Sequence, residues 1–171
     1  MCQYWFAHFD TAEDLDKNIV FKLNSLLPED IVIHDVKKVA DDKHVRFDAV
    51  TRSYEYRIWL GRNPFLLDTT WQLFHQKLDV DAMNEAAEML LEFEDFQAFS
   101  KVKTEVKTFN CNITEAKWIQ QGNELTFHIS ANRFLRNMVR AIVGTLVDVG
   151  KHKITQEDFR NIILSKDRSN A

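Results

Sequence analysis

Glycine and proline are scarce in this sequence, which has four glycines and two prolines among 171 residues. A chain so poor in both is not collagen-like, low-complexity or dominated by loops. Cysteine is equally rare, since only Cys2 and Cys111 occur. Two isolated cysteines supply neither a zinc framework nor a disulfide scaffold, so the sequence favours a reducing, cytoplasmic compartment.

Long apolar runs and an excess of positive charge are also missing. No run reaches the length of a membrane-spanning helix, and the first residues lack the pattern of a signal peptide, so we expect no membrane association. The formal net charge is −4, which gives no overall sign of nucleic-acid binding. A local basic patch is still compatible with this total, because binding depends on where the charges lie.

The common catalytic signatures are absent as well. The sequence has no Walker loop, no G-x-G-x-x-G and no G-x-S-x-G. Six histidines occur, but none stands two or four residues from another histidine or from a cysteine, the spacing typical of metal sites. We therefore expect scattered histidines and no metal site.

Apolar residues make up 45% of the chain and include thirteen phenylalanines, which predicts one sizeable, aromatic core. Alternation, apolar spacing and turn residues indicate the order of the elements. In the first part of the chain we predict a strand at 4–9, a helix at 12–26, a strand at 31–39, a long strand within 44–61 and an ambiguous segment at 65–78. A helix from Asp79 or Asp81 to 92 follows, then a loop or short helix with two buried phenylalanines at 94–100 and a polar alternating segment at 101–108. In the last part we predict two strands at 111–119 and 124–131, a helix at 134–149 ended by Gly150, and a helix from Thr155 to Lys166.

This order predicts an α+β protein with two lobes and a largely antiparallel sheet flanked by helices. The turn residues Gly122-Asn123 indicate a hairpin between the last two strands. We expect residues 1–50 to belong to the N-terminal lobe and residues 51–171 to form the C-terminal lobe, with the long strand leading from one to the other.

Three arginines gather beside the apolar helix near the C-terminus. Arg133, Arg136 and Arg140 are spaced three and four apart, so a helix that extends back to Arg133 would carry them on one flank. They either lie in water with their stems over apolar surface, or they face anions such as a carboxylate or RNA phosphates. Arg140 is closest to the middle of the helix, and we expect it to enter a buried or half-buried ion pair.

Two tyrosines on the long strand raise a similar choice. Tyr54 and Tyr56 share a strand face, and a structural role is the default for both. Arg46, Arg52 and Arg57 lie close to them in the sequence, however. Arginines beside exposed aromatic rings are typical of surfaces that stack bases and hold phosphates.

Several segments resemble one family, the tRNA pseudouridine synthase A family. RFDAVTRSYEYRI is similar to its Arg-Phe pair followed by R-x-Y-x-Y, and FLRNMVRAIVGTLVDVG is similar to its F-L-x-x-M-V-R-x-I-V-G helix. DFQAFS, LNSLLPEDIVI and the KDR near the end also resemble family segments. The matches are in order and cover almost the whole chain.

The resemblance implies a pseudouridine-synthase-like fold and an enzyme that isomerises uridine in the anticodon stem-loop of tRNA, at positions 38 to 40, without a cofactor. Tyr54 matches the tyrosine that stacks on the target base, and Arg140 matches the arginine that pairs with the catalytic aspartate. The resemblance also implies that the intact protein is a homodimer. Basic side chains assigned to RNA contact are Arg46, Arg52, Lys107, Arg133 and Arg136.

The sequence departs from the family at its most important point. The catalytic aspartate of the family, a nucleophile or a base, lies in a G-R-T-D-A-G-V-H-type loop that does not occur here. The A-P-A and G-L-x-L segments beyond KDR are also missing, and Lys107 precedes Thr108 where an Arg-Thr pair is common. We expect a large piece of the enzyme that is inactive by itself. The alternative is a non-catalytic RNA-binding module that lost the aspartate in evolution.

Overall fold

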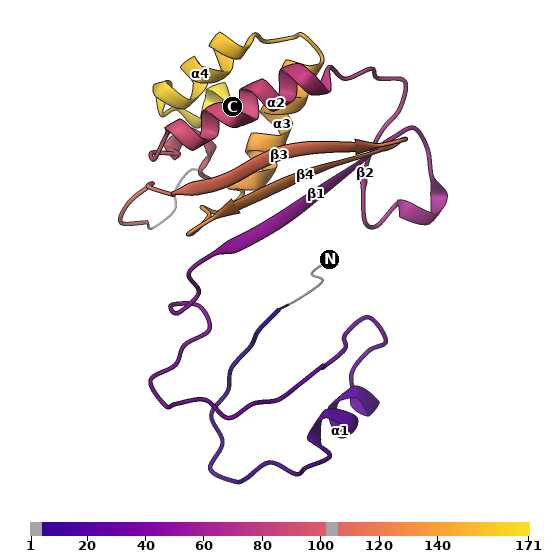
Figure 1. Cartoon of the computed structure of the whole chain (residues 1–171), viewed down its shortest axis with the longest axis vertical. Helices are drawn as coiled ribbons and strands as arrows, with labels where there is room; N and C mark the ends of the chain where they lie inside the picture. The colour runs from indigo at the N-terminus through magenta and orange to yellow at the C-terminus, as the bar shows by residue number, and fades with distance from the viewer. Residues whose placement is uncertain (1–4, 102–105) are drawn as a thin grey trace. The chain divides into compact units, whose positions relative to one another are not determined.

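The computed structural model describes residues 5–101 and 106–171. The chain divides into two compact units, residues 1–49 and 50–171, which we call the N-terminal unit and the C-terminal unit. Both are drawn in Figure 1. The segment 101–108 lies partly outside the described residues, so its alternation stays a prediction.

The N-terminal unit contains one regular element in its described residues, the helix α1 (Ile19–Leu26). The predicted strand at 31–39 is wrong, and so is the described part of the strand at 4–9. No residue between 5 and 49 is buried. A strand needs neighbouring strands and a face to bury, and the described part of this unit supplies neither, so apolar sequence alone does not produce one.

The helix α1 is also shorter than the predicted helix at 12–26. A turn at Asp16 precedes it, in which the Asp16 carboxylate accepts a hydrogen bond from the Asn18 N–H at 2.7 Å. Within the helix, the side chain of Asn24 accepts a hydrogen bond from the Ile33 N–H at 2.7 Å and donates one to the Ile33 carbonyl at 2.9 Å. Hydrogen bonds of polar side chains, and not a buried core, therefore stabilise the local structure of these residues.

The C-terminal unit is built on a four-stranded sheet in the order β2-β1-β4-β3. Its strands are β1 (Arg52–Leu60), β2 (Trp71–Leu73), β3 (Ile113–Gln121) and β4 (Glu124–Ala131). β4 pairs antiparallel with β1 and β3, and the short β2 pairs parallel with β1. The expected α+β class, the largely antiparallel sheet and the hairpin at Gly122-Asn123 are confirmed.

Three helices cover one face of this sheet, as Figure 1 shows. They are α2 (Val80–Met89), α3 (Met138–Gly150) and α4 (Gln156–Ser165). Between the elements lie the 3-10 turns η1 (Pro64–Leu66), η2 (Leu90–Glu92), η3 (Gln97–Phe99) and η4 (Arg168–Asn170). Phe96 and Phe99 are fully buried around η3, which confirms the prediction for residues 94–100.

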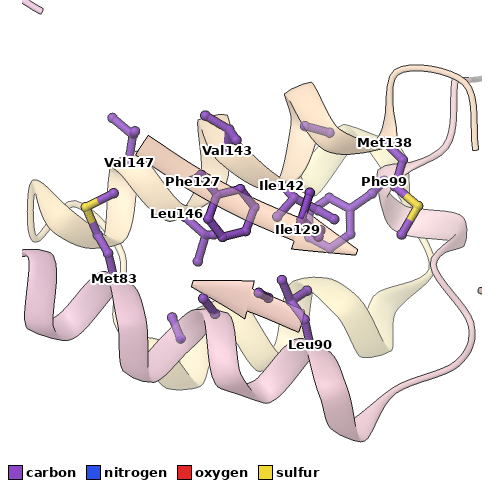
Figure 2. Packing of buried hydrophobic residues seen from close by; sticks show 14 of the residues in the cluster. Met83, Leu90, Phe99, Phe127, Ile129, Met138, Ile142, Val143, Leu146 and Val147 are labelled. Carbon is purple, nitrogen blue, oxygen red and sulfur yellow. The ribbon is translucent and has the colours of Figure 1, made fainter. Parts of the chain in front are cut away.

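The core lies between the sheet and these helices. Figure 2 shows Phe127 and Ile129 of β4 packed with Leu146 of α3 and Leu90. Asp79 caps α2 through a hydrogen bond that its side chain accepts from the Ala82 N–H at 3.0 Å. Thr155 caps α4 as predicted. The long predicted strand begins only at Arg52, because residues 44–48 form a turn closed by the Asp48 side chain.

The helix α3 differs from its prediction at both ends. It begins at Met138 because Asn137, with φ of 65°, has a left-handed backbone that interrupts any helix from residue 134. Gly150 is the last helical residue and not the cap, which is Lys151. The glycine is required there for space, since a Cβ at this position would collide with the side chain of Met83.

Candidate RNA-binding and catalytic surface

The strand β1 brings Tyr54 to the rim of the core. Tyr54 lies opposite Ile129 of β4, and Ile58 further along β1 lies opposite Leu125 on the same face. Ile58 is fully buried, whereas 49% of the Tyr54 surface is exposed. The ring of Phe134 meets that of Tyr54 edge-on, with centroids 5.1 Å apart and planes at 79°. Tyr54 therefore offers an oriented, accessible ring.

The segment between β4 and α3 forms a hydrogen bond with Arg52 of β1, a second predicted site residue. The carbonyl of Asn132 accepts a hydrogen bond from Nη1 of Arg52 at 2.8 Å. The same asparagine exchanges two hydrogen bonds with the backbone of Asn112, at 2.8 and 3.1 Å. Arg52 and Tyr54 are thus fixed to one short segment, at the same end of β1.

Arg133 and Arg136 lie in this segment and not on the helix, which corrects the expectation of three arginines on one helical flank. Leu135 between them is buried, and the Arg136 carbonyl accepts a hydrogen bond from the Lys101 N–H at 3.1 Å. Arg133 is half-buried and Arg136 is exposed. Burial raises the pKa of the Cys111 thiol, and the nearby positive charge of Arg133 opposes that rise.

Arg140 lies in the first turn of α3 and is exposed. The expected ion pair is absent from the described residues. No side chain caps this helix, and its first turn has no acidic residue. A cation at the positive end of a helix dipole is unfavourable, and the first N–H groups of a helix have no partner within it. A carboxylate or phosphate placed here would satisfy both.

The helix α4, unlike α3, carries the capping and acidic side chains that usually stabilise the start of a helix. Thr155 and Asp158 form a capping box, and Glu157 adds a second acid to the first turn. The hydrogen bonds from Thr155 hold the pKa of Asp158 below its usual value. The start of α3 has none of these groups among the described residues, which sets it apart as a place for an external anion.

Two other predicted contacts lie elsewhere. Lys107 is exposed in the segment that leads to β3. Arg46 belongs to the N-terminal unit, with its guanidinium 5.8 Å from the ring centre of Phe47. The structure therefore places Tyr54 and Arg52 against the segment that carries Arg133 and leads into α3. Arg46 belongs to the other unit, so its role stays a prediction.

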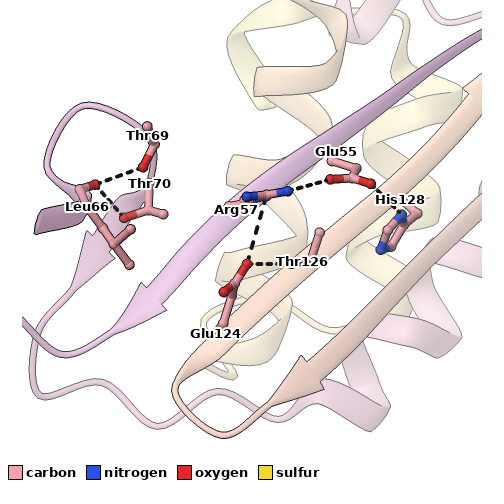
Figure 3. A network of polar contacts seen from close by, with 8 residues as sticks. All are labelled: Glu55, Arg57, Leu66, Thr69, Thr70, Glu124, Thr126 and His128. Atoms are coloured by element: carbon pink, nitrogen blue, oxygen red, sulfur yellow. Dashed lines mark hydrogen bonds and ion pairs between the residues drawn. The ribbon is translucent and has the colours of Figure 1, made fainter. Parts of the chain in front are cut away.

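Arg57 is close to Tyr54 and Tyr56 in the sequence but does not share their face of the strand. It lies on the opposite face of β1, where its Nη2 is 3.0 Å from Glu55 and its Nε is 3.8 Å from Glu124. His128 joins the group, with Nδ1 3.8 Å from Glu55. Figure 3 shows this polar network across β1 and β4. The period of two along a strand predicts this separation from the sequence.

Among the described residues, no cluster of three or more His, Cys, Asp or Glu side chains is placed to hold a metal. Within residues 5–101 and 106–171, no helix is long and apolar enough to cross a membrane.

The fold is that of a mixed α/β protein with a four-stranded sheet flanked by helices, consistent with a pseudouridine-synthase-like architecture. A family model described as tRNA pseudouridine synthase matches residues 86–171. The chain belongs to the tRNA pseudouridine synthase family.

Curated relatives agree with this assignment. A protein named tRNA pseudouridine synthase A from Parabacteroides distasonis is 47% identical over 96% of this chain and 66% of its own length. One from Porphyromonas gingivalis is 51% identical over 88% of this chain and 60% of its length. A protein named tRNA pseudouridine synthase A 2 from Clostridium perfringens is 39% identical over 98% of this chain and 69% of its length. The chain thus spans about two thirds of the length of these relatives.

Proposed function

We propose that the protein carrying this chain isomerises uridine to pseudouridine in the anticodon stem-loop of tRNA, in the cytoplasm and without a cofactor. The observation that carries the proposal is the pairing of an exposed, edge-held Tyr54 with the basic, uncapped start of α3. A target base must leave the RNA stack to be reached, and a fixed aromatic ring gives that base a stacking partner.

The proposed roles follow from charge and position. Tyr54 stacks on the displaced uracil. Arg140 pairs with the catalytic carboxylate and keeps it ionised, because a neighbouring positive charge lowers the pKa of an acid. Arg52, Lys107, Arg133 and Arg136 bind phosphates, and Arg46 is proposed for the same role from the N-terminal unit. The aspartate itself belongs to a G-R-T-D motif that these 171 residues do not contain.

Tritium release tests the proposal. When uracil is rejoined to the ribose through C5, the hydrogen on C5 is lost, so tRNA labelled there releases tritium. We expect the 171-residue chain to bind tRNA without releasing tritium, and a fusion that adds the aspartate loop of the Parabacteroides distasonis relative to release it. In that fusion, Arg140→Ala should abolish release while Arg168→Ala, a change of a half-buried arginine near the C-terminus, should not. A fusion that binds tRNA but stays inactive would contradict the proposal.

The missing aspartate motif favours one second function, a non-catalytic RNA-binding module. The coding sequence upstream of Met1 separates the two. A G-R-T-D loop encoded there supports the enzyme, and a genuine start codon with no such loop supports the binding module.

We also propose that the intact protein is a homodimer. Sedimentation equilibrium of the fusion should give twice the mass of one chain, and a monomeric fusion with full tritium release would contradict this.

A further inference from the structure

The ends of β1 and β2 carry an arginine and an aromatic ring that the proposed function does not use. Because these two strands are parallel, their C-terminal ends meet at one edge of the sheet, with Leu60 opposite Leu73. Gly61 bends the chain there with φ of 138° and donates its N–H to the Leu73 carbonyl at 2.9 Å. Arg62 and Phe74 follow directly, one on each strand.

These two side chains form a stacked pair. The guanidinium carbon of Arg62 lies 4.3 Å from the ring centre of Phe74, and the His75 ring lies 3.6 Å from the same ring centre to centre. All three residues are exposed. His75 has φ of 56°, a backbone conformation that non-glycine residues adopt uncommonly. The chain thus places the arginine and both rings together on the surface.

The Arg62–Phe74 pair differs from a structural pair elsewhere in the same unit. Arg160 lies 5.5 Å from the centre of Phe93, and it also forms an ion pair with Glu92 at 2.8 Å. Arg62 has no hydrogen bond or ion pair of its own within the described residues. Its five N–H donors are therefore held in place over a ring and available to an external acceptor.

We propose that Arg62, held over Phe74, binds a backbone phosphate and an adjoining unpaired base of the tRNA, away from the target uridine. The inference rests on the proposed function, which supplies the RNA. Guanidinium groups stack on bases and bind phosphates in pairs of hydrogen bonds, and holding the group in advance lowers the entropy lost on binding. His75 and Lys77 add basic character to a segment from 61 to 77 whose one carboxylate is Asp68.

The position of the pair indicates which part of the RNA it contacts. Six residues of β1 separate Tyr54 from Leu60, and a strand advances about 3.3 Å per residue, so about 20 Å lie between the target base and this pair. The segment between β1 and β2 also lies away from α2, α3 and α4 in Figure 1. An anticodon stem-loop bound at Tyr54 does not need this contact, whereas the body of a whole tRNA reaches further.

Binding measurements on two RNAs test the inference. We expect Arg62→Ala to weaken the affinity of the 171-residue chain for whole tRNA about tenfold and to reduce the salt slope by about one. Phe74→Ala, which keeps the charge but releases the arginine, should weaken it severalfold, and Arg62→Lys should be intermediate because lysine lacks the planar fork. The affinity for an isolated anticodon stem-loop should be unchanged in all three.

Phe65→Ala is the matched control. Phe65 is an aromatic residue of the same segment, 93% exposed and without a ring or cation partner among the described residues, so its removal should leave tRNA affinity as in the wild type. Thermal unfolding of each variant verifies that the fold is intact.

Three results would overturn the inference. They are whole-tRNA affinities of Arg62→Ala and Phe74→Ala equal to the wild type, an equal loss on the isolated stem-loop, and a loss of self-association by sedimentation with RNA affinity retained, which would assign the pair to a protein partner. A wild-type chain that binds no tRNA would instead contradict the proposed function itself.

Discussion

At the scale of single residues, the contact between Tyr54 and Phe134 is the most specific feature of the candidate site. A ring that meets another edge-on contributes about 0.5–1.5 kcal/mol beyond its burial, and here it also fixes the direction in which an exposed tyrosine points. The parity of β1 correctly predicts the face of Tyr54. The role of Phe134 follows only from the fold, because 80 residues of sequence separate the two rings.

Phe134→Leu tests this contact. Leucine keeps most of the apolar volume but has no ring edge, so we expect a fall of less than about 1.5 kcal/mol in the free energy of unfolding and a severalfold lower tritium release by the fusion. Phe134→Tyr should restore release, because the ring returns. Release that stays at the wild-type level in the leucine variant would show that the edge-on contact does not orient Tyr54.

Gly150 and Gly144 make a matched pair on one helix. A Cβ at Gly150 would collide with Met83, whereas a Cβ at Gly144 has no atom within 4 Å outside its own helix. We expect Gly150→Ala to lower the free energy of unfolding by about 1–3 kcal/mol through overpacking. Gly144→Ala should raise it by up to about 1 kcal/mol, since alanine favours the helix. Urea unfolding measures both, and equal signs would contradict the packing argument.

At the scale of elements, the sequence correctly predicted the features that depend on residues close together in the chain. The hairpin at Gly122-Asn123 and the helix capped by Thr155 are set by turn and cap chemistry close in sequence. The strands predicted at 4–9 and 31–39 needed partners from distant sequence, which the described residues do not provide. The predicted start of α3 is wrong for a third reason. The residue type of Asn137 does not reveal whether its backbone is left-handed or helical.

The capping box of α4 predicts a pH-dependent effect. Thr155→Ala should cost about 1 kcal/mol of stability at neutral pH. The folded pKa of Asp158 is lowered by hydrogen bonds from the Thr155 backbone N–H and, second, from the Thr155 hydroxyl, of which the variant removes only the hydroxyl. The stabilisation from the hydroxyl bond is complete above the unfolded pKa of Asp158, about 3.9, and is lost as pH falls through the folded value. Urea unfolding at several pH values should show the difference between the variant and the wild type shrink in acid. A constant difference would contradict the assignment.

At the scale of the whole molecule, the two units differ sharply in how much they bury. The C-terminal unit has a continuous core, whereas none of the residues 5–49 is buried and several large side chains there are exposed. Segments with few buried apolar contacts open with small free energies. The exposed side chains include Trp5, Phe6, Phe9, Phe21, Leu26 and Phe47.

Amide hydrogen exchange followed by mass spectrometry should show this difference. We expect peptides from residues 5–49 to exchange within the shortest labelling times and peptides from β1, β4 and α3 to be protected by orders of magnitude more. Addition of a segment that covers the N-terminal unit, as in the aspartate-loop fusion, should slow exchange there and leave β4 unchanged. Equal protection in both units of the unfused chain would contradict the burial pattern.

The strand β1 fixes the spacing between the two proposed RNA contacts. It carries Tyr54 near one end, and Arg62 follows its other end. Inserting one residue between them would turn the strand's later side chains to the opposite face and expose Ile58. Inserting two residues would keep every face but lengthen the spacing by about 7 Å. The length of β1 therefore limits which RNA shapes reach both contacts at once, so the sheet constrains substrate geometry as well as supporting the core.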